Sequence, residues 1–136
     1  MKKLLFAIPM AMLFSAPAVS GEKIELTEKQ QAKLDQRLAG RTAGEPRSCI
    51  TRNDQRNMTV ISDDILIFDS GRNAKTIYVN KPYGGCQNAD SSILSYSKPT
   101  SSLCRGEIVQ LIDHSTRMSM GSCAFGEFVP YTKNAD

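Results

Sequence analysis

The stretch that decides the fold is Leu103–Phe128, LCRGEIVQLIDHSTRMSMGSCAFGEF, close to the C-terminal end of the 136-residue chain. It contains a short apolar run, a polar turn region at 113–120 and a second strand-like segment. Two such segments joined by a polar turn are typical of a β-hairpin. Because Cys104 and Cys123 lie on opposite sides of the turn, we predict a hairpin whose two strands each carry a cysteine.

The N-terminus has the three parts of a secretory signal peptide. Lys2 and Lys3 form the positive region, Leu4–Phe14 is apolar, and small residues follow at 15–20. The apolar run is shorter than the roughly 20 residues that a membrane-spanning helix needs. We therefore predict a signal peptide at residues 1–20, a periplasmic or secreted protein, and no membrane span after cleavage.

The net charge of the mature chain is close to zero. The whole chain has 17 basic and 14 acidic residues, so removing Lys2 and Lys3 leaves 15 against 14, a charge of +1. A nearly neutral protein offers no electrostatic attraction for nucleic acid or for an anionic membrane. The remaining length, about 115 residues, is that of one domain, and we predict a monomer.

The four cysteines are Cys49, Cys86, Cys104 and Cys123, an even number that indicates two disulfides in an exported chain. The absence of a C-x-x-C motif argues against a zinc site and against a thioredoxin-like redox motif. Three pairings are possible. We favour Cys86–Cys104, which would close a local loop, and Cys49–Cys123, which would join the start of the β-domain to its last strand.

A helix is predicted at Thr27–Leu38, ahead of the β-rich part of the chain. Thr27 is suited to cap its N-terminus, and Gln30, three residues later, completes a capping-box pattern. Gly40 fits the position just beyond the C-terminus of the helix. Residues 41–46 are rich in Gly, Pro and charge, which is typical of a linker.

After residue 57 the pattern changes to short apolar or β-branched segments separated by turn residues. The expected strands are Met58–Ile61, Ile65–Phe68, Thr76–Val79, Ile93–Tyr96, Glu107–Ile112 and Gly121–Phe128. This pattern predicts a mainly β fold, a small antiparallel barrel or sandwich of five to six short strands, preceded by one N-terminal helix and joined by two disulfides. The expected divisions are a signal peptide at 1–20, a helix and linker at 21–46, a disulfide-stapled β-domain at 47–131 and a tail at 132–136.

Several segments around the cysteines share the pattern of a known family. They are Arg47 with Cys49, the Ile65–Phe68 strand, Tyr78 and Asn80 before Cys86, Leu103-Cys104-x-Gly106-Glu107, and Gly121-x-Cys123-x-x-Gly126-x-Phe128. This pattern resembles a family of small exported proteins, found largely in proteobacteria and catalogued only as a domain of unknown function. The resemblance implies a bacterial, periplasmic or secreted setting, and it implies no activity and no catalytic residues.

His114 is the sole histidine and lies between Asp113 and Ser115. A hydrolase would need His114 to converge in space with carboxylates, for which Glu107 and Glu127 are the candidates, and sequence neighbours alone do not make such a site. A small hydrolase is therefore an alternative function. With one histidine and oxidised cysteines, we predict no metal site and no cofactor.

The candidate binding residues lie in two stretches. Arg47, Arg52 and Arg56 are either an anion site or a solvated edge, since nearby acidic residues partly cancel their charge. Tyr83 lies in the Asn80–Gly85 loop, and tyrosines are common at interfaces. We therefore predict a non-enzymatic protein that binds a small ligand or an envelope protein, with an inhibitor or structural module as a further alternative.

Overall fold

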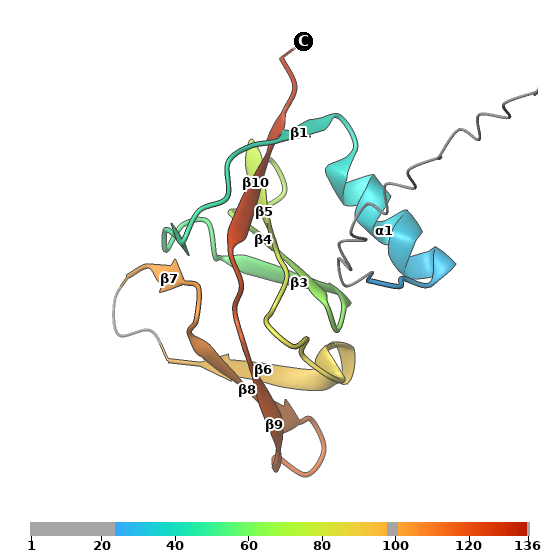
Figure 1. Ribbon diagram of the computed structural model, residues 1–136, viewed down its shortest axis with the longest axis vertical. Coiled ribbons are helices and arrows are strands. Elements are labelled where there is room, and N and C mark those ends of the chain that lie inside the picture. Colours follow the sequence, from blue (N-terminus) through green and yellow to red (C-terminus); the bar gives the residue numbers. More distant parts are fainter. Residues whose placement is uncertain (1–23, 98–100, 136) are drawn as a thin grey trace, which may run out of the picture.

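The structure, a computed structural model, describes residues 24–97 and 101–135, and the predicted signal peptide at 1–20 lies outside these ranges. The described residues form one α-helix, one 3₁₀-helix and ten strands arranged in three sheets (Figure 1). The prediction of a mainly β fold with one preceding helix and two disulfides is confirmed. None of the three sheets, as far as the chain is described, closes on itself into a barrel.

The largest sheet has five antiparallel strands. In spatial order they are β1 (Arg41–Ala43), β10 (Phe128–Lys133), β5 (Thr76–Asn80), β4 (Ile65–Asp69) and β3 (Asn57–Ser62). Every residue of β4 is buried. Side chains alternate across a strand, so Leu66 and Phe68 face one layer of apolar residues while Ile65 and Ile67 face another. Strand β4 is therefore covered on both faces.

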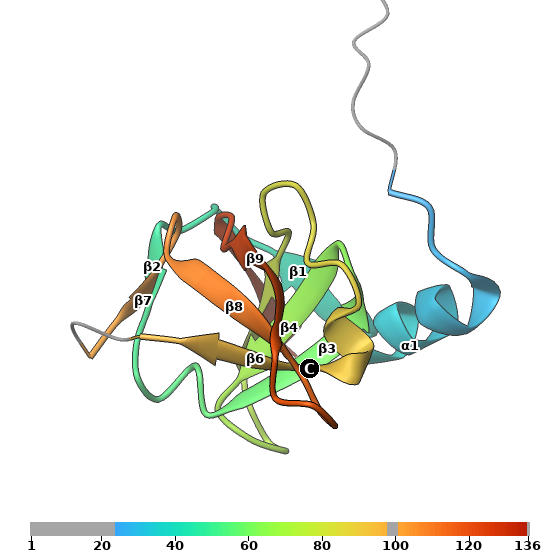
Figure 2. The ribbon, with the colours of Figure 1, turned by 90° about the horizontal axis from the view of Figure 1, so that it is seen from below.

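A second sheet lies on one side of this large sheet (Figure 2). Its strands are β6 (Ser92–Tyr96), β8 (Ile108–Asp113) and β9 (Ser119–Ala124), and the remaining strands, β2 (Cys49–Ile50) and β7 (Leu103–Cys104), pair with each other. The predicted hairpin is confirmed as β8 and β9. The prediction that each of its strands carries a cysteine is half right, because Cys104 lies in β7, ahead of β8.

The apolar core between these sheets is centred on three phenylalanines, all fully buried. The ring centroid of Phe68, from β4, lies 5.6 Å from that of Phe125 and 5.7 Å from that of Phe128, both in edge-to-face geometry. Such pairs contribute about 0.5–1.5 kcal/mol each beyond the area they bury. Val109 and Leu111 of β8 close the core from the second sheet.

Helix α1 (Glu28–Leu38) covers the other face of the five-stranded sheet (Figure 1). The predicted capping box is present, since the backbone N of Gln30 donates to Thr27 Oγ1 at 3.2 Å and the backbone N of Thr27 donates to Gln30 Oε1 at 3.0 Å. Leu34 and Leu38 pack against the second apolar cluster around Ile67. Among the described residues, no helix has the length and apolar character needed to cross a membrane.

The segments predicted as linker and tail pair with each other instead. Residues 41–43, expected in the linker, form β1, and Thr132 and Lys133, expected in the tail, belong to β10. Pro130 argues against a strand at β10 when the sequence is considered alone, because proline lacks the N–H that the interior of a strand needs. The carbonyl of Pro130 accepts from the N of Gly44, which lies just beyond the end of β1. The N–H that Pro130 lacks would point to this same side of β10, where the pairing with β1 has already ended, so no ladder hydrogen bond is lost.

The predicted disulfide pairing is wrong. The bonds are Cys49–Cys104 and Cys86–Cys123, with sequence separations of 55 and 37. The prediction assumed that the start of the β-domain meets the last strand, whereas β2 pairs with β7 and places Cys49 directly opposite Cys104. Loops of these lengths correspond to about 4 kcal/mol of stabilisation each in the chain-entropy model.

A buried asparagine joins the end of β5 to the connection between β9 and β10. Asn80 Nδ2 donates to the carbonyl of Gly126 at 2.8 Å, and the N of Gly126 donates to Asn80 Oδ1 at 3.0 Å. A Cβ on Gly126 would lie 2.1 Å from the carbonyl oxygen of Lys81, so only glycine fits there. The connection that leads into β10 is thus fixed by one side chain and one glycine.

The two disulfides are expected to differ in their accessibility to reductant. Cys49 is exposed, whereas Cys86 is fully buried and Cys123 is 6% exposed. A thiolate must reach a sulfur atom to exchange with it. Graded dithiothreitol under native conditions should therefore reduce Cys49–Cys104 first, measured by alkylation and peptide mass spectrometry. In a control under denaturing conditions, dithiothreitol should reduce both bonds. Reduction of Cys86–Cys123 before Cys49–Cys104 under native conditions would contradict the structure.

Candidate functional site

The structure does not bring the hydrolase candidates together. Glu107 precedes β8 and His114 follows it, so the six-residue strand separates them by about 20 Å at roughly 3.3 Å per residue. Glu107 Oε2 accepts from the N of Cys104 at 2.6 Å, and Glu127 Oε1 pairs with Arg105 Nη1 at 2.7 Å. Both carboxylates thus have local partners, and the geometry gives the hydrolase alternative no support.

His114 is exposed in the turn between β8 and β9, which its neighbour Asp113 organises. Asp113 Oδ1 accepts from the backbone N of Thr116 at 2.7 Å, from Thr116 Oγ1 at 3.0 Å and from the N of Ser115 at 2.9 Å. These bonds, led by that from the Thr116 backbone, hold the pKa of Asp113 below its usual value. Asp113 is the carboxylate next to His114, and its hydrogen bonds stabilise the turn rather than orient the histidine.

The three candidate arginines are exposed, and none of them lines the grooves described below. The backbone of Arg47 pairs with that of Phe128, while Arg52 and Arg56 belong to the turn region before β3. Burial raises the pKa of Tyr78, the charge of Asp54 raises it further and that of Arg47 lowers it. The negative charge of Asp54 thus offsets the positive charge of Arg47 near the Tyr78 hydroxyl. This agrees with the interpretation of the arginine-containing stretch as a solvated edge.

The structure places the fourth candidate, Tyr83, at the margin of the second sheet. Tyr83 is 54% exposed, and its backbone N donates to the carbonyl of Ala124 at 2.8 Å. This bridge makes Tyr83 an extension of the sheet beyond β9. Because Ala124 is directly opposite Ile108 in the β8–β9 pair, Tyr83, Ala124 and Ile108 lie on the same side of the sheet.

This side of the second sheet, which we call the outer face, faces away from the phenylalanine core. The register of β6, β8 and β9 places eight residues on it: Ile93, Ser95, Ile108, Gln110, Ile112, Ser122, Ala124 and Tyr83. None of the eight is charged, and Ile108 is 60% exposed. Ile93, Ile112 and Ala124 on this face are half-buried, and the opposite side of the sheet carries the buried Val109 and Leu111.

A groove of about 270 Å³ also borders Tyr83. Its lining comprises Val79, Lys81, Tyr83, Glu127, Val129 and Tyr131. Met118 and Met120, in and beside the β8–β9 turn, are 67% and 53% exposed. Met120 lines a further hollow with the Gly84–Gly85 turn that follows Tyr83.

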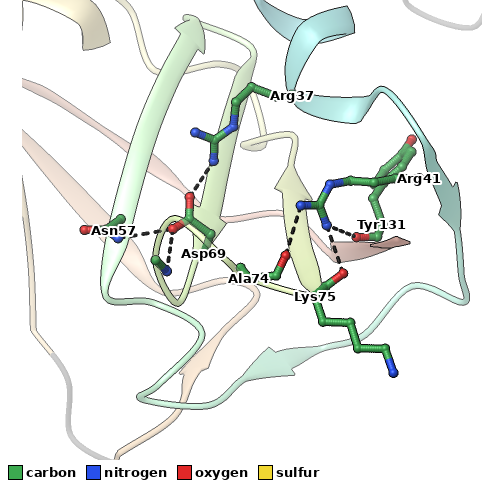
Figure 3. A network of polar contacts seen from close by, with 8 residues as sticks. Arg37, Arg41, Asn57, Asp69, Ala74, Lys75 and Tyr131 are labelled. Carbon is green, nitrogen blue, oxygen red and sulfur yellow. Dashed lines mark hydrogen bonds and ion pairs between the residues drawn. The ribbon is translucent and has the colours of Figure 1, made fainter. Parts of the chain in front are cut away.

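A basic groove of about 500 Å³ lies on the helix side of the five-stranded sheet, between the C-terminal end of α1 and the turn after β4. Figure 3 shows Arg37 reaching Asp69 and Arg41 reaching the carbonyls of Ala74, Lys75 and Tyr131. Sequence reasoning did not find this groove. Its cations come from segments up to 96 positions apart, from Arg37 to Lys133, and no local motif connects them.

Comparisons with protein-family models, with curated proteins and with solved structures give no match for this chain. The resemblance to a family of exported bacterial proteins therefore stays a prediction, and the function is argued from the geometry alone.

Asp113 is expected to titrate below the usual aspartate range of about 3.9. A lowered pKa means that its hydrogen bonds stabilise the folded protein above the unfolded pKa, and that this contribution is lost as the pH falls through the folded value. Replacing Thr116 with Val removes the hydroxyl donor and should raise the pKa of Asp113, as followed by NMR titration of its side chain. Ser115→Ala is the control, because Ser115 donates only through its backbone; an identical midpoint in wild type and Thr116→Val would contradict this assignment.

Proposed function

We propose that this protein is an exported, non-enzymatic component of the bacterial envelope that binds a partner protein through the outer face. The observation that carries the proposal is a sheet face without charge on which Ile108 and Tyr83 are more than half exposed. Exposed apolar patches on small proteins mark interaction sites. Depletion of charge and enrichment of tyrosine distinguish the centre of an interface from the rest of a surface.

The chemistry of the face favours a protein over other occupants. A nucleic acid or an anionic lipid surface is held by cations, and the outer face has none. Its polar members, Ser95, Gln110 and Ser122, are neutral groups that both donate and accept hydrogen bonds. The matching partner is a protein surface of apolar side chains with neutral hydrogen-bonding groups.

The scaffold suits binding without rearrangement. We propose that it is a sandwich rather than a barrel, because two open sheets share the core around Phe68. Cys123 fixes β9 to the loop around Cys86, next to the Tyr83 bridge. A face held by covalent bonds loses little conformational entropy on binding. Export itself is supported by the predicted signal peptide and by the two disulfides, which persist in oxidising compartments.

Site-specific cross-linking tests this proposal. A photo-reactive residue at Gln110, which is exposed at the centre of the outer face, should cross-link an envelope protein in cells, whereas one at the exposed Ala32 of α1 should not. Ile108→Asp should abolish the cross-link, since it places a charge in an apolar contact, and Ile108→Val should retain it. The purified partner, identified from the cross-link, should bind the Ile108→Asp variant at least about tenfold more weakly than wild type.

Three results would contradict the proposal. They are a cross-link between two copies of this chain, the same products from positions 110 and 32, and a cross-link that Ile108→Asp leaves intact while circular dichroism shows both variants to be folded.

A further inference from the structure

We propose that the basic groove binds the oxyanion of a small organic molecule, a phosphate or a carboxylate. The groove lies apart from the outer face, so this site is independent of the proposed partner. It is lined by four cations, Arg37, Arg41, Arg72 and Lys133, and by one carboxylate, Asp69, which leaves a formal charge of 4 − 1 = +3.

Asp69 neutralises only one of the four cations. It accepts from the guanidinium of Arg37, from Asn57 Nδ2 at 3.1 Å and from the N of Gly71 at 2.8 Å (Figure 3). The Asp69 side chain is 6% exposed and the Arg37 side chain 34%. This buried carboxylate is therefore satisfied by local donors, and its structural role is to hold the end of α1 against β4.

Arg41 is fixed in place without being neutralised. Its Nη1 donates to the carbonyl of Lys75 at 2.9 Å and its Nη2 to that of Ala74 at 3.0 Å, and carbonyls carry no net charge. Burial lowers the pKa of Arg41, the charge of Arg37 lowers it further and that of Asp69 raises it. The groove thus has a positive potential that its own residues leave uncompensated.

The other two cations are not held by polar contacts to the described part of the chain. Within residues 24–97 and 101–135, the side chains of Arg72 and Lys133 have no hydrogen-bond or ion-pair partner, and both are exposed. They enter the groove from different segments, Arg72 from the turn after β4 and Lys133 from the end of β10. Arginine and lysine side chains around one hollow supply the charge-assisted hydrogen bonds by which proteins hold phosphates and carboxylates.

The size and lining of the groove indicate a small polar ligand. A volume of about 500 Å³ is within the usual range for small-molecule sites. Asn57 and Thr59 add neutral hydrogen-bonding groups, while Ile77 and Ala39 supply limited apolar contact. The C-terminal end of α1 also borders the groove, and its partial charge of about −0.5 offsets only a small part of the four cations.

Binding is tested by calorimetry on the mature protein at low ionic strength, with inorganic phosphate, glycerol 3-phosphate and citrate as separate probes. Saturable binding of a phosphate probe or of citrate is expected. Tighter binding of a phosphate probe would assign the ligand as a phosphate, and tighter binding of citrate would assign it as a carboxylate. The double variant Arg72→Gln/Lys133→Gln removes the two free cations and should weaken binding at least about tenfold, because each cation would donate charge-assisted hydrogen bonds to the oxyanion. The thermal midpoint should stay near that of wild type, since neither side chain has a hydrogen-bond or ion-pair partner among the described residues.

The matched control is Arg47→Gln/Arg52→Gln, which removes the same charge from exposed positions outside the groove. It should change the affinity less than about twofold, by long-range electrostatics alone. Equal weakening in both double variants would overturn the proposal in favour of nonspecific attraction. The absence of saturable binding by all three probes would also overturn it, and neither result bears on the cross-linking at Gln110.

Discussion

The burial of β4 on both faces is the constraint on which the rest of the structure depends. A strand with one buried face needs one partner layer, whereas β4 has apolar residues at consecutive positions and must be covered twice. The second sheet covers Leu66 and Phe68, and helix α1 covers Ile65 and Ile67. Leu34 and Leu38 give α1 only a narrow apolar stripe. This stripe is sufficient to cover Ile65 and Ile67 because the sheet itself supplies most of the apolar surface on this side.

The two disulfides and Asn80 act where this layered packing is weakest. The two-residue strands β2 and β7 form too few ladder bonds to persist alone, and Cys49–Cys104 joins them covalently. Cys86–Cys123 fixes a long loop to β9, and Asn80 fixes the glycine connection into β10. As a result, β9, which contributes to the outer face, and the connection into β10, which carries Lys133 of the basic groove, are both held in place.

Local patterns predicted the elements that have a strong local cause. The capping box gave α1, and alternating or continuous apolar runs gave β3, β4, β5, β6 and the β8–β9 hairpin. The sequence could not predict β10, since Pro130 is compatible with that strand only because β1 ends beside it. Nor could it predict which cysteines pair, because the pairing follows from the contact of β2 with β7, two strands too short to show a period.

The candidate sites also divide into features that local sequence predicts and features that depend on tertiary contacts. Tyr83 was predicted from its loop, but its place on an uncharged sheet face depends on the bridge to Ala124. The basic groove was missed because Arg37, Arg72 and Lys133 become neighbours only through the tertiary fold. Conversely, Glu107 and His114 are close in sequence and separated by the length of β8.

The most direct test of the double burial of β4 is hydrogen exchange in an Ile67→Ala variant. Ile67 is fully buried on the helix side, and its truncation should lower the free energy of unfolding by about 2–5 kcal/mol. If β4 joins both layers into one cooperative unit, the amides of β8, in the far sheet, should lose as much protection as those of β5. Unchanged protection in β8, with loss confined to α1, β4 and β5, would contradict this account.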